Sequence, residues 1–326
     1  MLTKPRYFGV IHKNENVRMS SRSGGAFTAL SDYVLQNDGV VYGCILNDVQ
    51  QAVHIRTVSS EERNQMRGSK YVQSDMGTCF EQVRKDLCDG RKVLFSGTSC
   101  QVDGLKSFLA ATKTEGWILM VDILCHGTPS PLLWQEYLWW HEEKSGKKIL
   151  KADFRDKKQF GWKGHVETVT FEDGTAESLK VYAHLFYTHN VMRPSCHICP
   201  YSQLTRKADI TLADFWGWEK TNPAANTDNK GISLLIISTQ QGIDIFNEVR
   251  TSLNAFECKE ENCIQPPLLN PSDAPLGKEK FWKEYYEKGF NHIQKKYGHD
   301  GCYEAIKKLM PLWLLKKLKK LILRHK

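Results

Sequence analysis

Short apolar runs that alternate with helix-like segments place the strongest constraint on how the first half of this chain folds. Each run is short enough for a buried strand, and each helix-like segment carries apolar residues at helical spacing. The strand-like runs are residues 39–46, 52–58, 92–95 and 117–124, and the helix-like segments are 26–35, 76–87, 101–109 and 132–144. Strands that alternate with helices at this spacing predict an α/β core.

The pattern changes after residue 150. Three short segments alternate like antiparallel strands around the turn Glu172-Asp173-Gly174, and two further strands and a closing helix follow. The strands are residues 151–155, 165–171, 176–181, 209–213 and 232–238, and the helix is 240–253. We therefore predict a mixed α/β (α+β) fold: a mixed sheet with flanking helices, an antiparallel β insertion and a helical C-terminal tail.

These changes in pattern also predict the domain organisation. One domain spans residues 1–255, with an N-terminal part of about residues 17–91 and a C-terminal part of about 92–255. Residues 256–305 are expected to form a linker and helical extension, and residues 306–326 a basic tail.

The formal charge of +8 is concentrated in that tail. Residues 306–326 carry eight Lys and Arg and no acid, which equals the whole excess of basic over acidic residues (45 − 37 = 8). A basic face spread over the protein is therefore not expected, and we predict no nucleic-acid partner. Leu314, Leu315, Leu318, Leu321 and Ile322 share one helical face, opposite Lys316, Lys317, Lys319 and Lys320. Such a helix binds an anionic membrane surface or, alternatively, docks on the protein itself or a partner.

The N-terminus shows no apolar core of a signal peptide, and no apolar run approaches the roughly 18 residues of a membrane span. We therefore expect a cytoplasmic protein, with the tail as a means of peripheral attachment to the inner face of the membrane. Ten cysteines in a reducing compartment indicate metal binding or redox chemistry more than disulfides.

Four cysteines stand where ligands would stand. Cys196 and Cys199 form a CxxC pair followed directly by proline. Cys100 follows a strand and opens a helix, and Cys125 ends a strand before His-Gly-Thr-Pro. In a parallel sheet such strand ends line the ligand-binding edge. Together they supply the four thiolates of a cubane iron–sulfur cluster, while packed thiols are the alternative for Cys100 and Cys125.

Two other interpretations compete for the CxxC pair. A structural Cys₄ zinc site usually presents two such pairs, whereas this chain has one pair and two single cysteines. A thioredoxin-like dithiol needs a strand directly before the pair, and residues 185–193 do not show a strand pattern.

Two turns resemble places where backbone N–H groups meet a phosphate, although neither matches GxGxxG. They are Ser23-Gly24-Gly25 and Gly97-Thr98-Ser99, and ordinary helix capping is the alternative. Lys70 is a candidate to neutralise a pyrophosphate, unless it is simply solvated. His126, beside Cys125, is a candidate proton donor, although a turn histidine more often binds backbone.

Seven ordered motifs resemble the coenzyme F-420 hydrogenase/dehydrogenase beta-subunit family, an FAD and iron–sulfur group that includes chlorophyll-pathway vinyl reductases. The resemblance runs from about residue 17 to about residue 250. The motifs are SRSGGAF (21–27), RGSKYVQS (67–74), KVLFSGTSCQVDGL (92–105), CHGTPSP (125–131), FRDK (154–157), RPSCHICP (193–200) and DITLADFWG (209–217).

The resemblance implies an FAD-dependent iron–sulfur oxidoreductase that couples one-electron transfer through a [4Fe–4S] cluster to two-electron chemistry on a small-molecule substrate. It implies that the four cysteines bind the cluster. It implies that FAD is held by Ser23, Gly24, Gly25, Lys70, Gly97, Thr98, Ser99, Gln101 and Asp214. Similar bacterial proteins often accompany polysaccharide-building enzymes, which suggests a sugar or lipid-linked substrate.

The chain departs from the family pattern in two respects. It starts without the ferredoxin-like segment of many similar bacterial chains, so we expect a separate electron donor such as a ferredoxin or flavin reductase. Ser99 and Ala213 stand where Pro and often Gly are expected. Two other function classes remain: an electron-transfer subunit of a larger redox complex, and a non-redox, zinc-stabilised binding protein.

Overall fold

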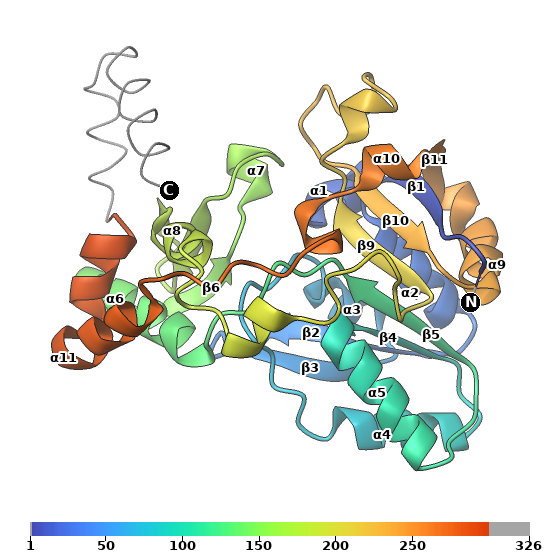
Figure 1. The fold of residues 1–326 in the computed structure, drawn as a ribbon, viewed down its shortest axis with the longest axis horizontal. Helices are drawn as coiled ribbons and strands as arrows, with labels where there is room; N and C mark the ends of the chain where they lie inside the picture. The colour runs from blue at the N-terminus through green and yellow to red at the C-terminus, as the bar shows by residue number, and fades with distance from the viewer. Residues whose placement is uncertain (1, 300–326) are drawn as a thin grey trace.

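The structure is a computed structural model that describes residues 2–299, so the predicted basic tail lies outside the described residues. An eight-stranded mixed sheet, in the order β11-β1-β10-β9-β5-β4-β2-β3, forms the larger part (Figure 1). Its strands are β1 (Arg6–His12), β2 (Val40–Leu46), β3 (Ala52–Thr57), β4 (Val93–Thr98), β5 (Ile118–Ile123), β9 (Ile210–Asp214), β10 (Ser233–Ile237) and β11 (Leu253–Cys258).

Five strands of this sheet end at the same edge. Strands β2, β4, β5 and β9 are parallel neighbours. Strand β10 is antiparallel to both β9 and β1, so β1 runs in the same direction as β9. The loops that follow these five strands are therefore brought to one carboxyl edge, where α/β sheets commonly bind ligands.

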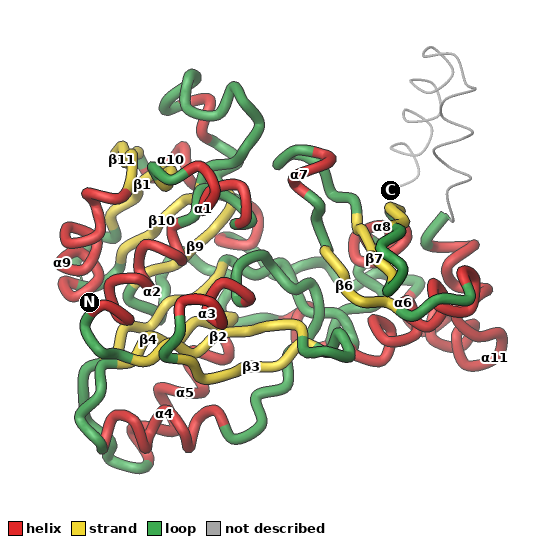
Figure 2. The backbone as a smooth tube through the Cα atoms, turned by 180° about the vertical axis from the view of Figure 1, so that it is seen from behind, coloured by secondary structure: helices red, strands yellow, loops and turns green. Residues whose placement is uncertain are grey.

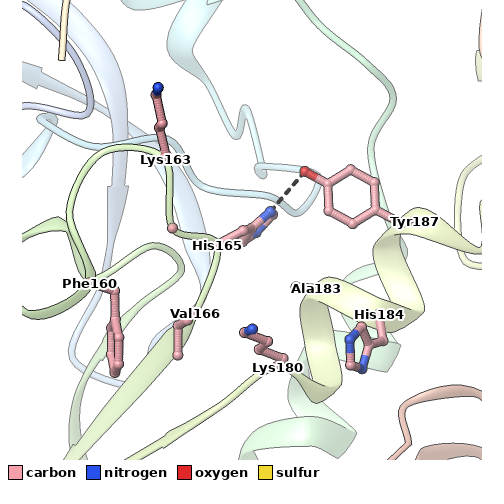
Figure 3. Close-up of a pocket in the computed structure, with 9 residues that line it drawn as sticks. Phe160, Lys163, His165, Val166, Lys180, Ala183, His184 and Tyr187 are labelled. Atoms are coloured by element: carbon pink, nitrogen blue, oxygen red, sulfur yellow. Dashed lines mark hydrogen bonds between the residues drawn. The ribbon is translucent and has the colours of Figure 1, made fainter. Parts of the chain in front are cut away.

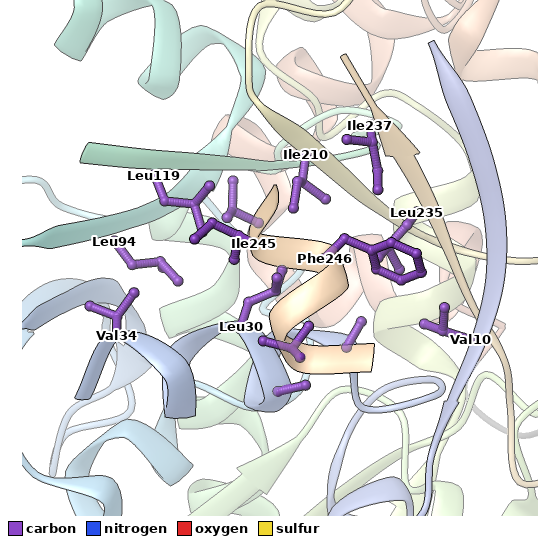
Figure 4. Packing of buried hydrophobic residues seen from close by; sticks show 14 of the residues in the cluster. Val10, Leu30, Val34, Leu94, Leu119, Ile210, Leu235, Ile237, Ile245 and Phe246 are labelled. Atoms are coloured by element: carbon purple, nitrogen blue, oxygen red, sulfur yellow. The ribbon is translucent and has the colours of Figure 1, made fainter. Parts of the chain in front are cut away.

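Helices cover both faces of the large sheet (Figure 2), and apolar side chains fill each interface. Helices α2 (Ala26–Gln36) and α9 (Gln240–Val249) pack on one face, and α4 (Cys79–Cys88) and α5 (Ser99–Ala111) on the other. Figure 4 shows the first interface, where helix residues meet the strands: Leu30, Val34, Ile245 and Phe246 against Val10, Leu94, Leu119, Ile210, Leu235 and Ile237.

A second, smaller layer is built from the insertion between β5 and β9 and from the C-terminal helix. The antiparallel sheet β6 (Ile149–Asp153), β7 (Glu167–Phe171) and β8 (Ala176–Leu179) lies with α6 (Pro131–Ser145), α8 (Val181–Tyr187) and α11 (Lys278–Tyr297). Trp134, Tyr137, Phe154 and Tyr182 centre its core. The Trp134 indole N–H donates to the Gln50 carbonyl at 2.7 Å, which joins this layer to the loop between β2 and β3.

The predicted fold class is confirmed: a mixed sheet, flanking helices, an antiparallel insertion and a C-terminal helix are all present. The remaining elements are short: α1 (Glu15–Ser20), α3 (Ser60–Gln65), α7 (Lys157–Phe160), α10 (Glu260–Cys263) and the 3-10 turns η1 (Pro194–Ile198), η2 (Trp218–Lys220), η3 (Arg250–Ser252) and η4 (Pro266–Leu268). No helix within residues 2–299 is long and apolar enough to cross a membrane.

A buried ion pair ties the end of β5 to the loop before β9. Asp122 is 0% exposed, and its carboxylate accepts from Arg206 Nη2 at 2.6 Å and from the Ser99 hydroxyl at 2.7 Å. We expect Arg206→Met to lower the free energy of unfolding by about 3–5 kcal/mol, because it strands a buried carboxylate. Urea unfolding measures the change. The exposed Arg6–Glu257 pair supplies the control, since Arg6→Met should cost no more than about 1 kcal/mol.

Glu167 on β7 gives the insertion a distinctive pH dependence. Its buried carboxyl accepts from the Ala183 N–H of α8, and burial raises its pKa from 4.5 to about 8. Between these values the folded state keeps a proton that the unfolded chain releases, so stability falls as pH rises, by up to about 1.4 kcal/mol per pH unit. Glu167→Gln should therefore gain stability relative to the unchanged protein from pH 5 to 8 in urea titrations. Stability–pH curves that run parallel for Glu167→Gln and the unchanged protein would contradict this. Glu172→Gln, at an exposed position, serves as the control.

Candidate functional site

The carboxyl edge of the large sheet gathers the residues singled out in the sequence. Thr98 ends β4, Cys125 follows β5 by two residues, and Asp214 ends β9. Strands β4, β5 and β9 are consecutive in the sheet, so their ends stand about 5 Å apart in turn. Ser23 joins them from the turn after β1 and α1, through a hydrogen bond to Asp214.

The structure brings the four predicted ligand cysteines into one neighbourhood. Cys100 is exposed at the start of α5, Cys125 is half-buried, and Cys196 and Cys199 lie in and after η1. Burial above all, with smaller contributions from the charges of Cys196, Cys100 and Cys199 in that order, raises the pKa of Cys125 to about 12. Among residues 2–299, no three His, Cys, Asp or Glu side chains converge closely enough to hold a single metal ion.

Polar groups of the surrounding loops point at these sulfurs. The Thr128 N–H donates to Cys196 Sγ at 3.4 Å, and the Thr98 hydroxyl lies 3.1 Å from Cys100 Sγ. The Gly127 N–H also hydrogen-bonds to Cys125, and this bond lowers the pKa of the thiol against the effect of burial. Donors of this kind stabilise thiolates, and in iron–sulfur proteins they also adjust the reduction potential.

His126 lies directly beside this thiol group. Its Nε2 is 2.9 Å from His189 Nε2, and its ring packs against Phe186 and Tyr187. Burial and then the neighbouring His189 lower the pKa of His126. The contact between the two Nε2 atoms can hold one shared proton, and Tyr187 extends the aromatic contact to the insertion.

Asp214 is the centre of a second polar group. Its carboxylate accepts from the Ser23 hydroxyl and, at 3.0 Å, from Arg22 Nη2, while Arg155 Nη1 lies 3.5 Å away. The Trp162 indole N–H donates to the Ser23 hydroxyl oxygen at 2.8 Å. Because Arg155 and Trp162 come from the insertion, this group joins the two layers of the protein.

Arg22 is left with unused hydrogen-bonding capacity inside this group. Its side chain is only 9% exposed, yet Nε and Nη1 have no partner among the described residues. An unpartnered buried donor costs free energy, and two on one guanidinium indicate a position for an acceptor or anion. Lys157 adds positive character, since its Nζ donates to the Ser23 carbonyl at 3.2 Å. Burial, then Arg22 and Arg18, lower the pKa of Lys157 to about 7.

Two stacked tryptophans form one wall beside these charges. The rings of Trp162 and Trp216 are 4.2 Å apart and nearly parallel, at 18°. Trp162 is fully buried, whereas Trp216 is 43% exposed, and the Arg155 guanidinium lies 5.9 Å from its ring centre. A supported, part-exposed indole beside buried cations is suited to stack on a planar group that carries negative charge.

The predicted residues of the second turn lie at the same edge, around Cys100. The Thr98 N–H donates to Gln101 Oε1 at 2.9 Å, and Gln101 Nε2 donates to the Ser74 hydroxyl at 2.9 Å. The Ser99 hydroxyl is committed to the buried Asp122–Arg206 pair. Gly97 lies within β4 and packs against Gln101, which fills the space beside its Cα. No hydrogen bond among residues 2–299 joins this turn directly to the Asp214 group.

Lys70 is held by backbone. Its Nζ donates to the carbonyls of Gln65 and Arg67 at 2.9 and 3.1 Å, and burial lowers its pKa to about 8. The next residue, Tyr71, accepts from Arg155 Nη1 at 3.2 Å. Lys70 therefore reaches the Asp214 group through its neighbour and not through its own amine.

The glycines of the first turn are required by close packing. A Cβ on Gly24 would lie 2.1 Å from the Val10 carbonyl oxygen, and the Gly24 N–H already donates to the Ser233 hydroxyl at 2.9 Å. Gly25 has φ of 91° and caps α2. The turn thus fixes Ser23 and Arg22 at the edge of the sheet.

A cavity of about 490 Å³ opens in the insertion, beside this edge (Figure 3). Its lining contains neither the cysteines nor Asp214; the link is Tyr187, which lines the cavity and also contacts His126. The Tyr187 hydroxyl lies 3.0 Å from His165 Nδ1. Burial and the charges of Arg155 and Arg22 lower the pKa of His165 to about 3, so this ring is neutral.

Several of these residues were not identified from the sequence. Arg22 lies inside the motif SRSGGAF and Arg155 inside FRDK. Both motifs were recognised in the sequence, but neither arginine was singled out as a site residue. Trp162, His165 and Tyr187 gave no local signal at all. Their importance depends on the insertion folding back onto the turn at Ser23.

The fold and the site define an α/β protein with a thiol group beside a buried, cationic and aromatic site at one sheet edge. The family model for the C terminus of the coenzyme F420 hydrogenase/dehydrogenase beta subunit matches residues 90–261, just over half of the chain. The chain therefore belongs to this family of oxidoreductase subunits, which confirms the predicted resemblance.

A solved structure shows the same fold at low sequence identity. It is a chain from the xenon-derivatised F420-reducing [NiFe] hydrogenase complex of Methanosarcina barkeri. The two chains are 18% identical with a TM-score of 0.55, and the similarity covers 90% of this chain and 93% of that one. No curated protein matched the sequence.

Proposed function

We propose that this chain is an iron–sulfur flavoprotein oxidoreductase. Cys100, Cys125, Cys196 and Cys199 would hold a [4Fe–4S] cluster, and the Asp214 group would hold the FAD. The observation that carries the proposal is the juxtaposition, at the carboxyl edge formed by β4, β5 and β9, of four neighbouring thiols and a buried arginine with two unpartnered guanidinium nitrogens.

The chemistry of the thiol group fits an iron–sulfur cluster. Thiolate sulfur is the standard ligand of such clusters, and a cubane takes four. The ligands would come from three separate loops, after β4, after β5 and at η1, which allows them to surround a group larger than one ion. The Thr128 N–H that reaches Cys196 would then serve as a hydrogen bond to a ligand sulfur.

The Asp214 group fits a flavin nucleotide. Arg22 Nε and Nη1 offer a donor pair to an acceptor or phosphate, and Arg155 increases the positive potential; Lys157, whose pKa is lowered to about 7, adds to it when protonated. Trp216 offers a flat face for an aromatic ring. Lys70 and the turn Gly97–Gln101 would extend the same site along the sheet edge. When bound, the flavin supplies two-electron chemistry and exchanges single electrons with the cluster.

The chain's own residues would orient the bound groups and control protons and water. Arg22 and Arg155, fixed by Asp214, would hold the anionic part of the nucleotide. The His126–His189 contact would hold a proton beside the cysteine loop. The Tyr187–His165 pair would place a phenol at the mouth of the cavity, where a small-molecule substrate has access. A sugar or lipid-linked molecule is the substrate class that we propose.

A second function is favoured by the structural neighbour, which is part of a multi-subunit hydrogenase complex. In this alternative the chain relays electrons within an assembly and does not reduce a substrate of its own. Turnover by the isolated protein with an artificial reductant would separate the two, since a relay protein exchanges electrons only with its partner.

The proposal is tested by an anaerobic visible spectrum together with iron, sulfide, zinc and flavin analysis of one sample. We expect about four iron atoms, about four sulfides and one FAD per chain. Stoichiometric zinc without flavin would reject the proposal in favour of a zinc-stabilised binding protein.

A further inference from the structure

Two unusually exposed apolar side chains lie on segments that meet at the thiol group. Leu276 and Ile198 are the most exposed large apolar residues of the described chain, at 107% and 80%. Ile198 stands in η1, between Cys196 and Cys199. Leu276 belongs to residues 270–277, which we call the strap; it connects η4 to α11.

Hydrogen bonds hold the strap against the cysteine loops. His197 Nδ1 lies 3.0 Å from the Ser272 carbonyl, and Lys278 Nζ lies 2.8 Å from His197 Nε2. The Ser272 hydroxyl donates to the carbonyl of His126. In Figure 1 the orange strap crosses the middle of the molecule beside the yellow loop that follows η1. Ile198 and Leu276 therefore lie on neighbouring exposed segments, next to the loops that carry the cysteines.

The charge of this region is positive. Residues 178–208 contain no Asp or Glu. Arg193, exposed just before η1, makes no side-chain hydrogen bond or ion pair within residues 2–299, and Lys278 adds a charge beside His197. The nearby acids are Asp273, exposed on the strap, Glu279, exposed directly after Lys278, and Asp103, which accepts from the Tyr201 hydroxyl; exposed Lys207 adds a further positive charge to the segment after η1. An approaching partner would thus meet an apolar centre with a mainly basic rim.

We propose that Ile198 and Leu276, rimmed by Arg193 and Lys278, form the docking surface for a small acidic electron-carrier protein. This inference rests on the proposed function, because a carrier would exchange electrons with the cluster proposed at the thiol group. An apolar centre with a polar rim is the usual anatomy of an interface, and opposite charge accelerates encounter. A second copy of this chain fits less well. In a twofold contact the same surface meets itself, so the positive charges of Arg193 and Lys278 would face like charges.

Binding of a purified acidic ferredoxin, and separately of a flavodoxin, to the full-length protein tests the proposal. Anaerobic calorimetry at low and at high salt gives the affinity. We expect Ile198→Ser to weaken binding about tenfold, the scale of one well-buried apolar side chain. Arg193→Glu should weaken binding about tenfold at low salt and far less at 1 M salt, where charges are screened within about 3 Å.

Matched controls come from surface remote from the strap. Val58→Ser removes an exposed apolar side chain directly after β3. Because β3 runs antiparallel to β2, Val58 lies at the opposite edge of the sheet. Arg84→Glu reverses an exposed charge on α4. Both should bind the carrier as the unchanged protein does. Circular dichroism on every variant establishes that it is folded.

The outcomes separate this proposal from the proposed function. Unchanged affinity in both Ile198→Ser and Arg193→Glu, or no binding of either carrier at low salt, would overturn the docking surface. Sedimentation that shows a dimer dissociated by Ile198→Ser, with carrier binding unaltered, would assign the surface to a second copy instead. Iron and flavin are measured on the same samples, so protein that lacks both but binds through Ile198 would reject the function and retain the surface.

Discussion

Replacing Cys125 by serine is expected to remove nearly all iron from anaerobically purified protein, from about four atoms per chain to below one. Cys125 is half-buried and central to the thiol group, since the other three cysteines all act on its pKa. A serine hydroxyl is a poor ligand for iron–sulfur iron, because it stays protonated and lacks the soft sulfur donor. Iron and sulfide analysis measures the loss. The visible spectrum at roughly 380–420 nm, where sulfur-to-iron charge transfer absorbs, follows it independently.

Cys88→Ser is the matched control, because Cys88 is an exposed cysteine at the end of α4, away from the sheet edge. It should retain the full iron content. Equal iron in Cys125→Ser and Cys88→Ser would remove Cys125 from the ligand set. Equal loss in both would show that iron content follows cysteine number or handling and not this site. Urea unfolding of both variants establishes that each chain still folds.

The sequence was sufficient for the parts of the fold that local periodicity specifies. The apolar runs at residues 39–46 and 117–124 became β2 and β5, and the segment at residues 26–35 became α2. Strand-end reasoning also placed Cys100 and Cys125 at the carboxyl edge of the sheet, because parallel strands carry their following loops to one side. These inferences needed only the direction of the chain and the spacing of its apolar residues.

The two strands at the β11 end of the large sheet escaped notice because their pattern is weak. Strand β1 lies between β10 and β11. The start of the chain, residues 1–7, was weighed only as a signal peptide, and the residues of β11 were divided between the end of a predicted helix and a predicted linker. Both strands owe their place to partners more than 200 residues away along the chain, as in the pairing of Phe8 with Leu235 and Glu257. Propensity within a short window carries no information about such pairing.

The site shows the same limit at the level of single residues. Asp214 was identified, but its partners Arg22 and Arg155 were not, because one precedes it by 192 positions and the other arrives with the insertion. Only the assembled structure shows that a guanidinium is buried without enough partners. A motif thus locates the loop that forms a site, while the unsatisfied donors show which side chain faces the ligand.

That distinction yields the sharpest prediction for the flavin. Arg22→Met is expected to weaken FAD binding by about tenfold to hundredfold, because it removes charge-assisted hydrogen bonds worth about 1.5–3 kcal/mol. Quenching of flavin fluorescence during titration of FAD into flavin-free protein gives the affinity. Arg22→Lys should recover only part of it, since one ammonium keeps the charge but loses the planar pair of donors.

Arg84→Met, an exposed arginine on α4, controls for the loss of a positive charge and should bind FAD normally. The Arg22 variant is expected to fold, because Asp214 keeps the Ser23 hydroxyl and Arg155 as partners. The methionine also removes two unpartnered buried donors, so urea unfolding of flavin-free protein should show little loss of stability. Unchanged FAD affinity in a folded Arg22→Met protein would place the flavin elsewhere along the edge. The turn at Gly97–Gln101 would then be the part of the site to alter next.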